Sequence, residues 1–200
     1  MNSRRNFIKK SSLITLGALN YNFTPLMTKI NGVDISVITY SFKPGPEETN
    51  YILQSCIDSR IDNIELMGYH IEKSMGIPRY KRSHADWRAN VTNKRLKSMK
   101  NFFNDNGINI FAFKPNCINS DYTDGEIEYA MRATKALGAE FLINELLDND
   151  EIDRVNYFAK KHKVKVGYHT HSNSIGRNKL TTDQAWDYAC LLYTSPSPRD

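Results

Sequence analysis

Short apolar runs alternate with longer amphipathic stretches through the middle of this chain. Runs of four to eight residues, rich in β-branched and aromatic types, are typical of buried strands. Five such runs are present, at 33–40, 63–67, 108–113, 141–144 and 164–171. Between them, apolar residues recur every three or four positions, as on the buried face of a helix. These helical stretches run from Pro46 to Arg60, from Leu96 to Gly107, from Thr123 to Gly138 and from Asp150 to His162, and another begins at Thr182.

Strands that alternate with helices predict an α/β fold built on a parallel sheet. A repeat of about 30 residues suits a (β/α)8 barrel, which usually needs about 250 residues. The alternative is an open doubly wound sheet, which usually has a glycine-rich turn after its first strand. Here that turn reads Lys43-Pro44-Gly45-Pro46, which does not fit a phosphate loop of the G-x-G-x-x-G type. We therefore expect a (β/α)8 TIM barrel truncated after about five βα units, with 68–90 as a long polar connection.

Local capping signals support the helix over 124–137. Thr123 is followed three positions later by Glu126, which is the spacing of a capping box. Gly138 follows the last apolar position of the stretch, where a helix commonly ends.

The N-terminal segment differs from the rest of the chain. Arg4-Arg5 and Phe7-Ile8-Lys9 precede a short, weakly apolar stretch, an arrangement that resembles a twin-arginine export signal. The stretch is too short to span a membrane. We expect residues 1–28 to be a signal and linker, and the protein to be periplasmic or exported with no stable membrane anchor. An ordinary basic amphipathic terminus is the alternative.

The last eleven residues, 190–200, are similar to one reading frame of a transposase-type sequencing adapter. We expect them to be a non-native tail, with a genuine Pro/Ser-rich tail as the alternative. The partial barrel then covers 29–189, and the chain is a fragment of a longer protein.

Neither the charge nor the cysteine content of the chain indicates a further class of function. The formal net charge is +5, but four of the 27 basic residues lie in the signal, which leaves 23 against 22 acidic residues. This balance does not favour nucleic acid as a partner. The spacing of Cys56 and Cys117 fits no metal motif, and Cys56 lies on the apolar face of a helix, where it suits core packing.

Polar side chains gather where the predicted strands end, which is where parallel α/β folds place their chemistry. His169 and His171 share one face of the fifth strand, because residues two apart point the same way. Glu145 follows an apolar run, where a carboxylate is costly unless it is paired or metal-bound. We predict these three as the catalytic residues and as ligands of a divalent ion, Mn²⁺, Mg²⁺ or Zn²⁺.

Four further residues are predicted to bind substrate: Tyr40, Glu65, His70 and Lys114. Tyr69 and Trp87 could stack on a sugar ring. Three of these residues have an ordinary alternative: Glu65 could pair with a neighbouring lysine, Lys114 could be a solvated loop residue, and His70 lies in a predicted loop.

Three segments together resemble the sugar phosphate isomerase/epimerase family, which has a xylose-isomerase-like TIM barrel. They are Asn63-Ile64-Glu65-Leu66-Met67-Gly68-Tyr69-His70, Phe111-Ala112-Phe113-Lys114-Pro115 and Tyr168-His169-Thr170-His171. The resemblance implies a divalent metal at the strand ends, and isomerisation, epimerisation or related elimination on sugars. Many members have a metal-binding Glu on the fifth strand, where this chain has His169 or His171.

The function expected from these observations is that of a metal-dependent sugar isomerase or epimerase. It would remove the proton α to a carbonyl and pass through an enediolate. Export favours a small-molecule sugar substrate without a phosphate. A dehydratase or keto-glycoside lyase on the same barrel is one alternative, and a non-catalytic exported sugar-binding barrel is another.

Overall fold

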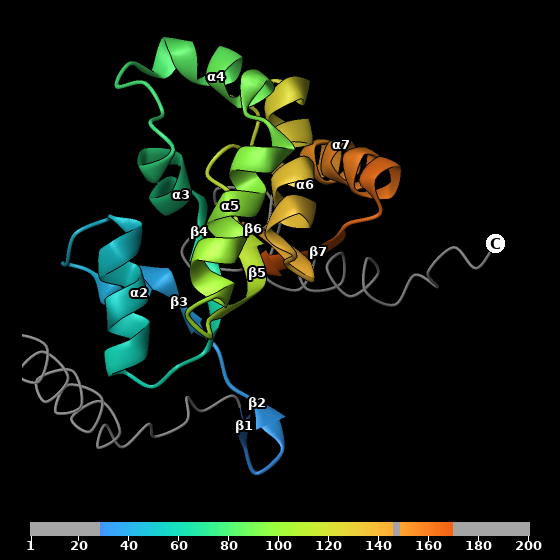
Figure 1. The fold of residues 1–200 in the computed structure, drawn as a ribbon. Coiled ribbons are helices and arrows are strands. Elements are labelled where there is room, and N and C mark those ends of the chain that lie inside the picture. Colours follow the sequence, from blue (N-terminus) through green and yellow to red (C-terminus); the bar gives the residue numbers. More distant parts are fainter. Residues whose placement is uncertain (1–28, 146–148, 170–200) are drawn as a thin grey trace, which may run out of the picture.

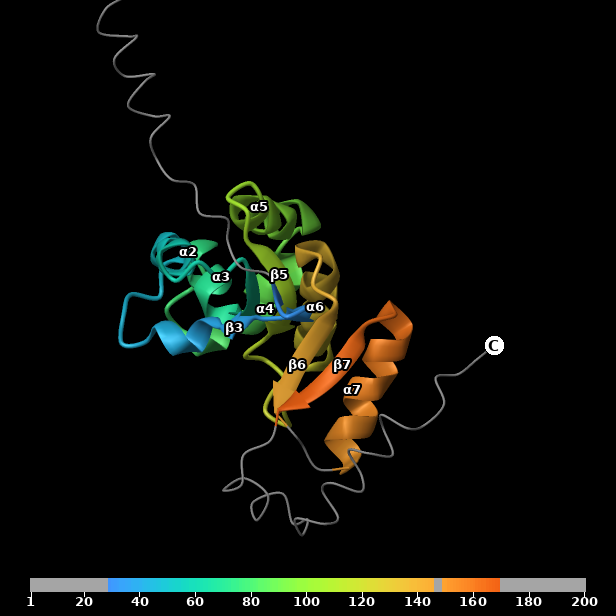
Figure 2. The ribbon, with the colours of Figure 1, turned by 90° about the horizontal axis from the view of Figure 1, so that it is seen from below.

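The computed structural model describes residues 29–145 and 149–169. Five strands form one parallel sheet in which spatial order follows chain order (Figures 1 and 2). They are β3 (Val37–Ile38), β4 (Asn63–Met67), β5 (Asn109–Lys114), β6 (Phe141–Glu145) and β7 (Lys165–His169). A doubly wound sheet would reverse its strand order, whereas consecutive neighbours are the rule in a barrel wall. The structure thus confirms the α/β class and the truncated barrel.

Helices fill the connections between these strands. The α-helices are α2 (Thr49–Asp58), α3 (Gly68–Ser74), α4 (His84–Asn90), α5 (Asn93–Asn104), α6 (Asp124–Leu137) and α7 (Asn149–His162). Short 3₁₀ turns are η1 (Thr39–Phe42) and η2 (Lys81–Ser83). The predicted capping box is present at α6: the Thr123 side chain accepts from the backbone N–H of Glu126, and the Glu126 carboxylate accepts from that of Thr123. Gly138 ends the helix in the left-handed conformation, with φ 77°.

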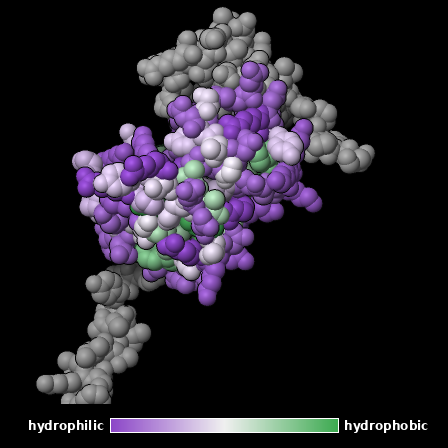
Figure 3. All heavy atoms as spheres, turned by 90° about the horizontal axis from the view of Figure 1, so that it is seen from above, coloured by the Kyte–Doolittle hydropathy of each residue, from purple (hydrophilic) through white to green (hydrophobic). Residues whose placement is uncertain are grey.

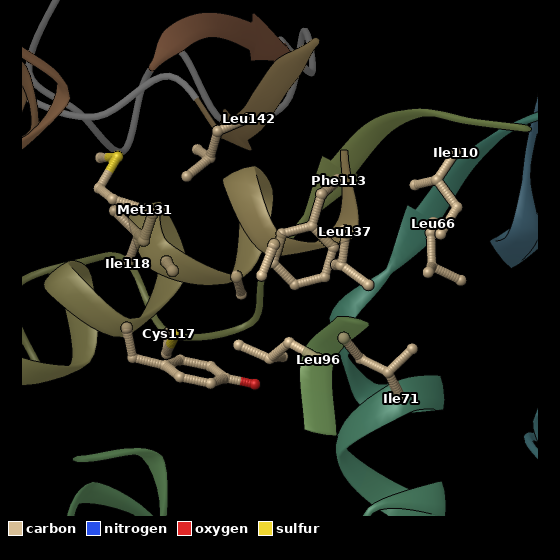
Figure 4. Close-up of a cluster of buried hydrophobic side chains, with 14 of the residues drawn as sticks. Leu66, Ile71, Leu96, Ile110, Phe113, Cys117, Ile118, Met131, Leu137 and Leu142 are labelled. Atoms are coloured by element: carbon tan, nitrogen blue, oxygen red, sulfur yellow. The ribbon is translucent and has the colours of Figure 1, made fainter. Parts of the chain in front are cut away.

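The hydrophobic core lies between the sheet and its helices, as Figure 4 shows. Ile64 and Leu66 of β4 are fully buried, and so are Phe113 of β5 and Leu142 of β6. Leu96 of α5 and several α6 residues belong to the same cluster. Hydrophilic residues cover most of the face seen in Figure 3. Cys56 is buried as predicted, and burial raises the pKa of its thiol to about 12.

The predicted first strand, 33–40, is wrong as a single element. Its beginning, β2 (Val33–Asp34), pairs antiparallel with β1 (Lys29–Ile30), and only Val37–Ile38 joins the main sheet. Asn31 and Gly32 between β1 and β2 have φ values of 51° and 83°, as an Asn-Gly hairpin turn requires. This local turn holds the start of the segment away from the main sheet.

Two other boundaries differ from the prediction. Residues 68–90 are not one polar connection, since they contain α3, η2 and α4. The helix expected from Pro46 begins at Thr49, because its N-cap residue, Glu48, still has an extended backbone with φ −70° and ψ 139°.

No helix among the described residues is long and apolar enough to cross a membrane. The predicted signal (1–28), His171, the helix from Thr182 and the adapter-like tail all lie outside the described residues.

Candidate active site

Four of the predicted site residues share one face of the sheet near the carboxyl ends of neighbouring strands. Glu65 lies between the fully buried Ile64 and Leu66, so it points to the opposite face from the helices. Met67 pairs with Lys114 in the register of β4 and β5, which puts Lys114 on the same face as Glu65. Two strands further along, Glu145 and His169 are register partners. These four side chains therefore lie on one face of the sheet near the carboxyl ends of the strands, which is where the sequence analysis expected polar side chains to gather.

Lys114 and Glu145 form the contact at the centre of this group. The Lys114 ammonium donates to Oε1 of Glu145 over 2.6 Å. The Lys114 side chain is only 11% exposed, whereas that of Glu145 is 45% exposed. Lys114 is therefore not a solvated loop residue. Its charge is held against a carboxylate that solvent, and so a substrate, can reach.

Glu65 lies within electrostatic range of both of these residues. Burial raises the pKa of the Glu65 carboxyl above its ordinary value; Lys114 lowers it and Glu145 raises it again. Oε1 of Glu65 is enclosed and has no hydrogen-bond partner in the described part of the chain. A carboxyl whose proton affinity is increased by burial is suited to accept and return a proton.

Of the two predicted histidines, the structure describes only His169, which ends β7, and His171 lies outside the described residues. Within the ranges 29–145 and 149–169, no three His, Cys, Asp or Glu side chains come together as metal ligands. Glu145, the carboxylate predicted to bind the ion, is instead in contact with Lys114. These residues do not by themselves make the ligand set that the family resemblance implies.

The remaining predicted substrate residues lie elsewhere. Tyr40 is on η1 and 53% exposed, with the Lys43 ammonium 4.5 Å from its ring centre. His70 is only 1% exposed, and its Nδ1 donates to the backbone carbonyl of Glu47 over 2.9 Å. Burial lowers the pKa of His70, so the ring is held neutral. The roles of Tyr40 and His70 in binding stay predictions. Trp87 is half-buried and packs edge-on against buried Tyr129, and its stacking role also stays a prediction.

The structure contains a buried network of charged side chains that was not predicted from the sequence. Arg88 of α4 donates twice to Glu72 of α3, over 2.8 and 2.9 Å, and once to Glu126 of α6, over 2.8 Å. All three side chains are 7% exposed or less. Burial opposes the charge on Arg88, but the two carboxylates outweigh it and raise the pKa of the guanidinium. The network ties α3, α4 and α6 together.

A cavity of about 500 Å³ opens next to this network. Its wall includes Tyr69, the second residue of α3, and Asn116, which lies just beyond β5. The close approach of these two segments favours a glycine at position 68, because a Cβ there would lie 3.1 Å from Cα of Pro115. Of the residues that line the cavity, Tyr69 is the one that the sequence analysis had suggested, as a residue that could stack on a sugar ring.

No protein-family model matches the chain, and no curated protein does either. Among solved structures, the chain is similar to a sugar phosphate isomerase/epimerase from Parabacteroides distasonis, with 19% identical residues and a TM-score of 0.44. The match covers 70% of this chain and 52% of that one, so this chain spans about half the length of that structure. A likeness this distant carries no argument, and the fold and site rest on this chain's own geometry.

Proposed function

We propose that this chain is part of a sugar isomerase or epimerase that moves a proton on the carbon beside a carbonyl group. The observation that carries the proposal is the contact of Lys114 with Glu145, beside a half-buried Glu65, at adjacent strand ends. The substrate we propose is a small sugar or sugar derivative without a phosphate, because the N-terminus resembles an export signal and sugar phosphates are mostly cytoplasmic.

The three residues can divide the chemistry between them. Glu65 takes the proton from the carbon, and the electrons of that C–H bond move onto the carbonyl oxygen to give an enediolate. The Lys114 ammonium hydrogen-bonds to this oxygen as its negative charge develops. Glu145 accepts a hydrogen bond from the Lys114 ammonium and so holds it in place. Glu65 isomerises the sugar when it returns the proton to the former carbonyl carbon while the α-hydroxyl proton passes to the former carbonyl oxygen. Epimerisation results when water protonates the α-carbon from the opposite face and Glu65 releases its proton to solvent.

We also propose, separately from the proton transfer, that the site binds a divalent ion, Mn²⁺, Mg²⁺ or Zn²⁺. Glu145 and His169 are the described residues that would contribute to it, together with His171. When bound, such an ion would polarise the carbonyl as a Lewis acid. Because the described residues supply no complete ligand set, the proton transfer above is assigned to Glu65 and Lys114 alone. Metal analysis of the purified chain, with and without His169→Ala, tests the ion.

The proton transfer is tested by exchange with solvent. The full chain is incubated in D₂O with a panel of aldoses, ketoses and sugar acids, and loss of the α-proton is followed by NMR. We expect Glu65→Gln to slow exchange about 10²–10⁴-fold, the usual contribution of a general base. Lys165→Met is the matched control, since Lys165 lies on the same face but pairs with Glu140 at the other end of the sheet, and it should change the rate less than twofold.

The pH dependence of exchange gives a second readout. Since burial raises the pKa of Glu65, the acidic limb of the rate profile should lie above 4.5, the ordinary value for this carboxyl. Exchange that survives in Glu65→Gln contradicts the assignment of the base. A product lighter by one water identifies a dehydratase, loss of an aglycone a lyase, and tight sugar binding without exchange a non-catalytic barrel.

A further inference from the structure

We infer that the cavity beside the strand ends is a subsite for the carboxylate of a sugar acid. The inference rests on the proposed function in so far as this sugar acid is the substrate. The cavity's volume of about 500 Å³ lies within the roughly 300–1,000 Å³ typical of small-ligand sites. Its lining comes from Glu47 before α2, from α3, η2, α4 and the connections between them, and from the segment after β5.

Among the described residues, the charges around the cavity leave two cations without an ion pair. Lys73 is paired with Glu47 and Glu48, at 3.7 and 3.0 Å. Arg88 is paired with Glu72 and Glu126. Only Arg79 and Lys81 then line the cavity as side-chain cations without an ion pair in the described part of the chain.

The position of these two cations favours one anionic group. Both side chains are exposed at the rim, so each keeps its charge accessible to a ligand. A guanidinium and an ammonium two residues apart can bind the same carboxylate, the guanidinium through two parallel hydrogen bonds.

The inner wall of the cavity suits the ring of a sugar. Tyr69 and Tyr122 both line it, and tyrosines supply flat contact area with a polar end. The Tyr69 hydroxyl is enclosed and has no hydrogen-bond partner within the described ranges. Burial raises the pKa of Tyr69, so the hydroxyl stays protonated and can donate to a sugar oxygen. Asn116 adds an amide that can both donate and accept.

The cavity is also joined to the proposed catalytic residues by the chain itself. Asn116 follows Lys114 by two residues, so their Cα atoms are at most about 7 Å apart. Tyr69 follows the last residue of β4 by two positions, and the close approach at Gly68 holds these segments together. Glu65, Lys114 and Glu145 do not line the cavity themselves, and Asn116 and Tyr69 are the lining residues that follow their strands. The substrate class we assign is therefore the sugar acids.

Binding, measured without turnover, tests the subsite. The full chain is titrated calorimetrically with glucuronate, glucose and glucose 6-phosphate. We expect glucuronate to bind at least tenfold more tightly than glucose. The double variant Arg79→Gln/Lys81→Gln should lose this preference. The matched control Arg82→Gln/Lys94→Gln also removes two exposed cations, neither of which lines the cavity, and should keep the preference within twofold.

Each outcome is decisive. Equal binding of glucuronate and glucose, or equal loss in both double variants, overturns the subsite. Binding of glucose 6-phosphate but not glucuronate overturns the sugar-acid assignment and points to a phosphate. If glucuronate binds as expected but no sugar exchanges its α-proton, the proposed function fails and the subsite stands. If neutral sugars exchange and glucuronate binds no better, the subsite fails and the proposed function stands.

Discussion

Replacing Arg88 with methionine should be among the most damaging single changes in this fold. Methionine keeps the unbranched apolar stem but has no donors for Glu72 and Glu126. Those carboxylates now accept three hydrogen bonds of 2.8–2.9 Å from one guanidinium that is 3% exposed. Without Arg88 they would be two buried negative charges near one another with no cation between them.

The size of the effect follows from this burial. Removing one partner of a buried ion pair costs about 3–5 kcal/mol, because the remaining charge stays desolvated. Taking m as about 2 kcal/mol per molar urea, a loss of about 4 kcal/mol lowers the unfolding midpoint by about 2 M. An exposed pair sets the comparison: Lys165 and Glu140 are 67% and 50% exposed, and Lys165→Met should cost only about 0–1 kcal/mol.

Urea unfolding followed by circular dichroism measures both variants. Arg88→Lys should fall between them, because an ammonium keeps the charge but not the forked geometry. The difference between the wild-type chain and Arg88→Met should shrink as pH falls. Burial raises the pKa of Glu126, but hydrogen bonds from the Thr123 N–H and from Arg88 outweigh it and lower the pKa in the folded chain. The ionised Glu126 carboxylate therefore stabilises the fold above pH 4.5, and this stabilisation is lost as the pH falls towards the pKa of the folded chain. A cost for Arg88→Met below 1 kcal/mol at pH 7, no larger than that for Lys165→Met, would refute the reasoning.

Two further changes test the β4–α3 junction. Burial lowers the folded pKa of His70, so the unfolded chain binds the proton more readily, and stability should fall as pH drops below about 6.5. Urea midpoints at pH 7.5 and 5.5 should differ less in His70→Gln than in the wild-type chain; an equal difference contradicts the assignment. Gly68→Ala places a Cβ 3.1 Å from Cα of Pro115 and should cost about 1–3 kcal/mol, read as a lower melting temperature. The control is Gly125→Ala in α6, where the nearest atom is 3.9 Å away and about 0.5–1 kcal/mol should be gained.

Those parts of the fold that depend on neighbouring residues in the chain could be predicted. The strand at Asn63–Met67 and the helix Asp124–Leu137 match the prediction, because apolar periodicity and capping are local properties. Thr123 and Glu126 are three residues apart, so their mutual hydrogen bonds follow from helix geometry. The Asn31-Gly32 hairpin was equally local, and its signal was present but not used.

The second role of Glu126 could not be predicted in this way. Its other carboxylate oxygen accepts from Arg88, 38 residues earlier in the chain, and Arg88 in turn binds Glu72, 16 residues before it. Each of the three looks like a solvated charge in its own helix. The packing of α4 against α6 and the ion pair between Arg88 and Glu72 of α3 remove them from water, and no local pattern encodes these contacts.

Lys114 lies on the same face of the sheet as Glu65 because of one irregularity in strand pairing. The alternation of apolar and polar residues in the sequence does not reveal this irregularity. Ile64 pairs with Ile110, but the next residue, Glu65, pairs with Ala112, so the register shifts by one residue at this point. Without the shift, Lys114 would continue on the face of Ile64 and Ile110, which are 0% and 1% exposed against the helices. A bulge of this kind re-aims every later side chain of the strand. The same five-residue overlap of β4 and β5 thus forms an apolar core seam at its beginning and a charged site at its end. The strand-end rule placed Lys114 at the correct edge of the sheet, and the bulge put its ammonium on the face where Glu65 and Glu145 lie.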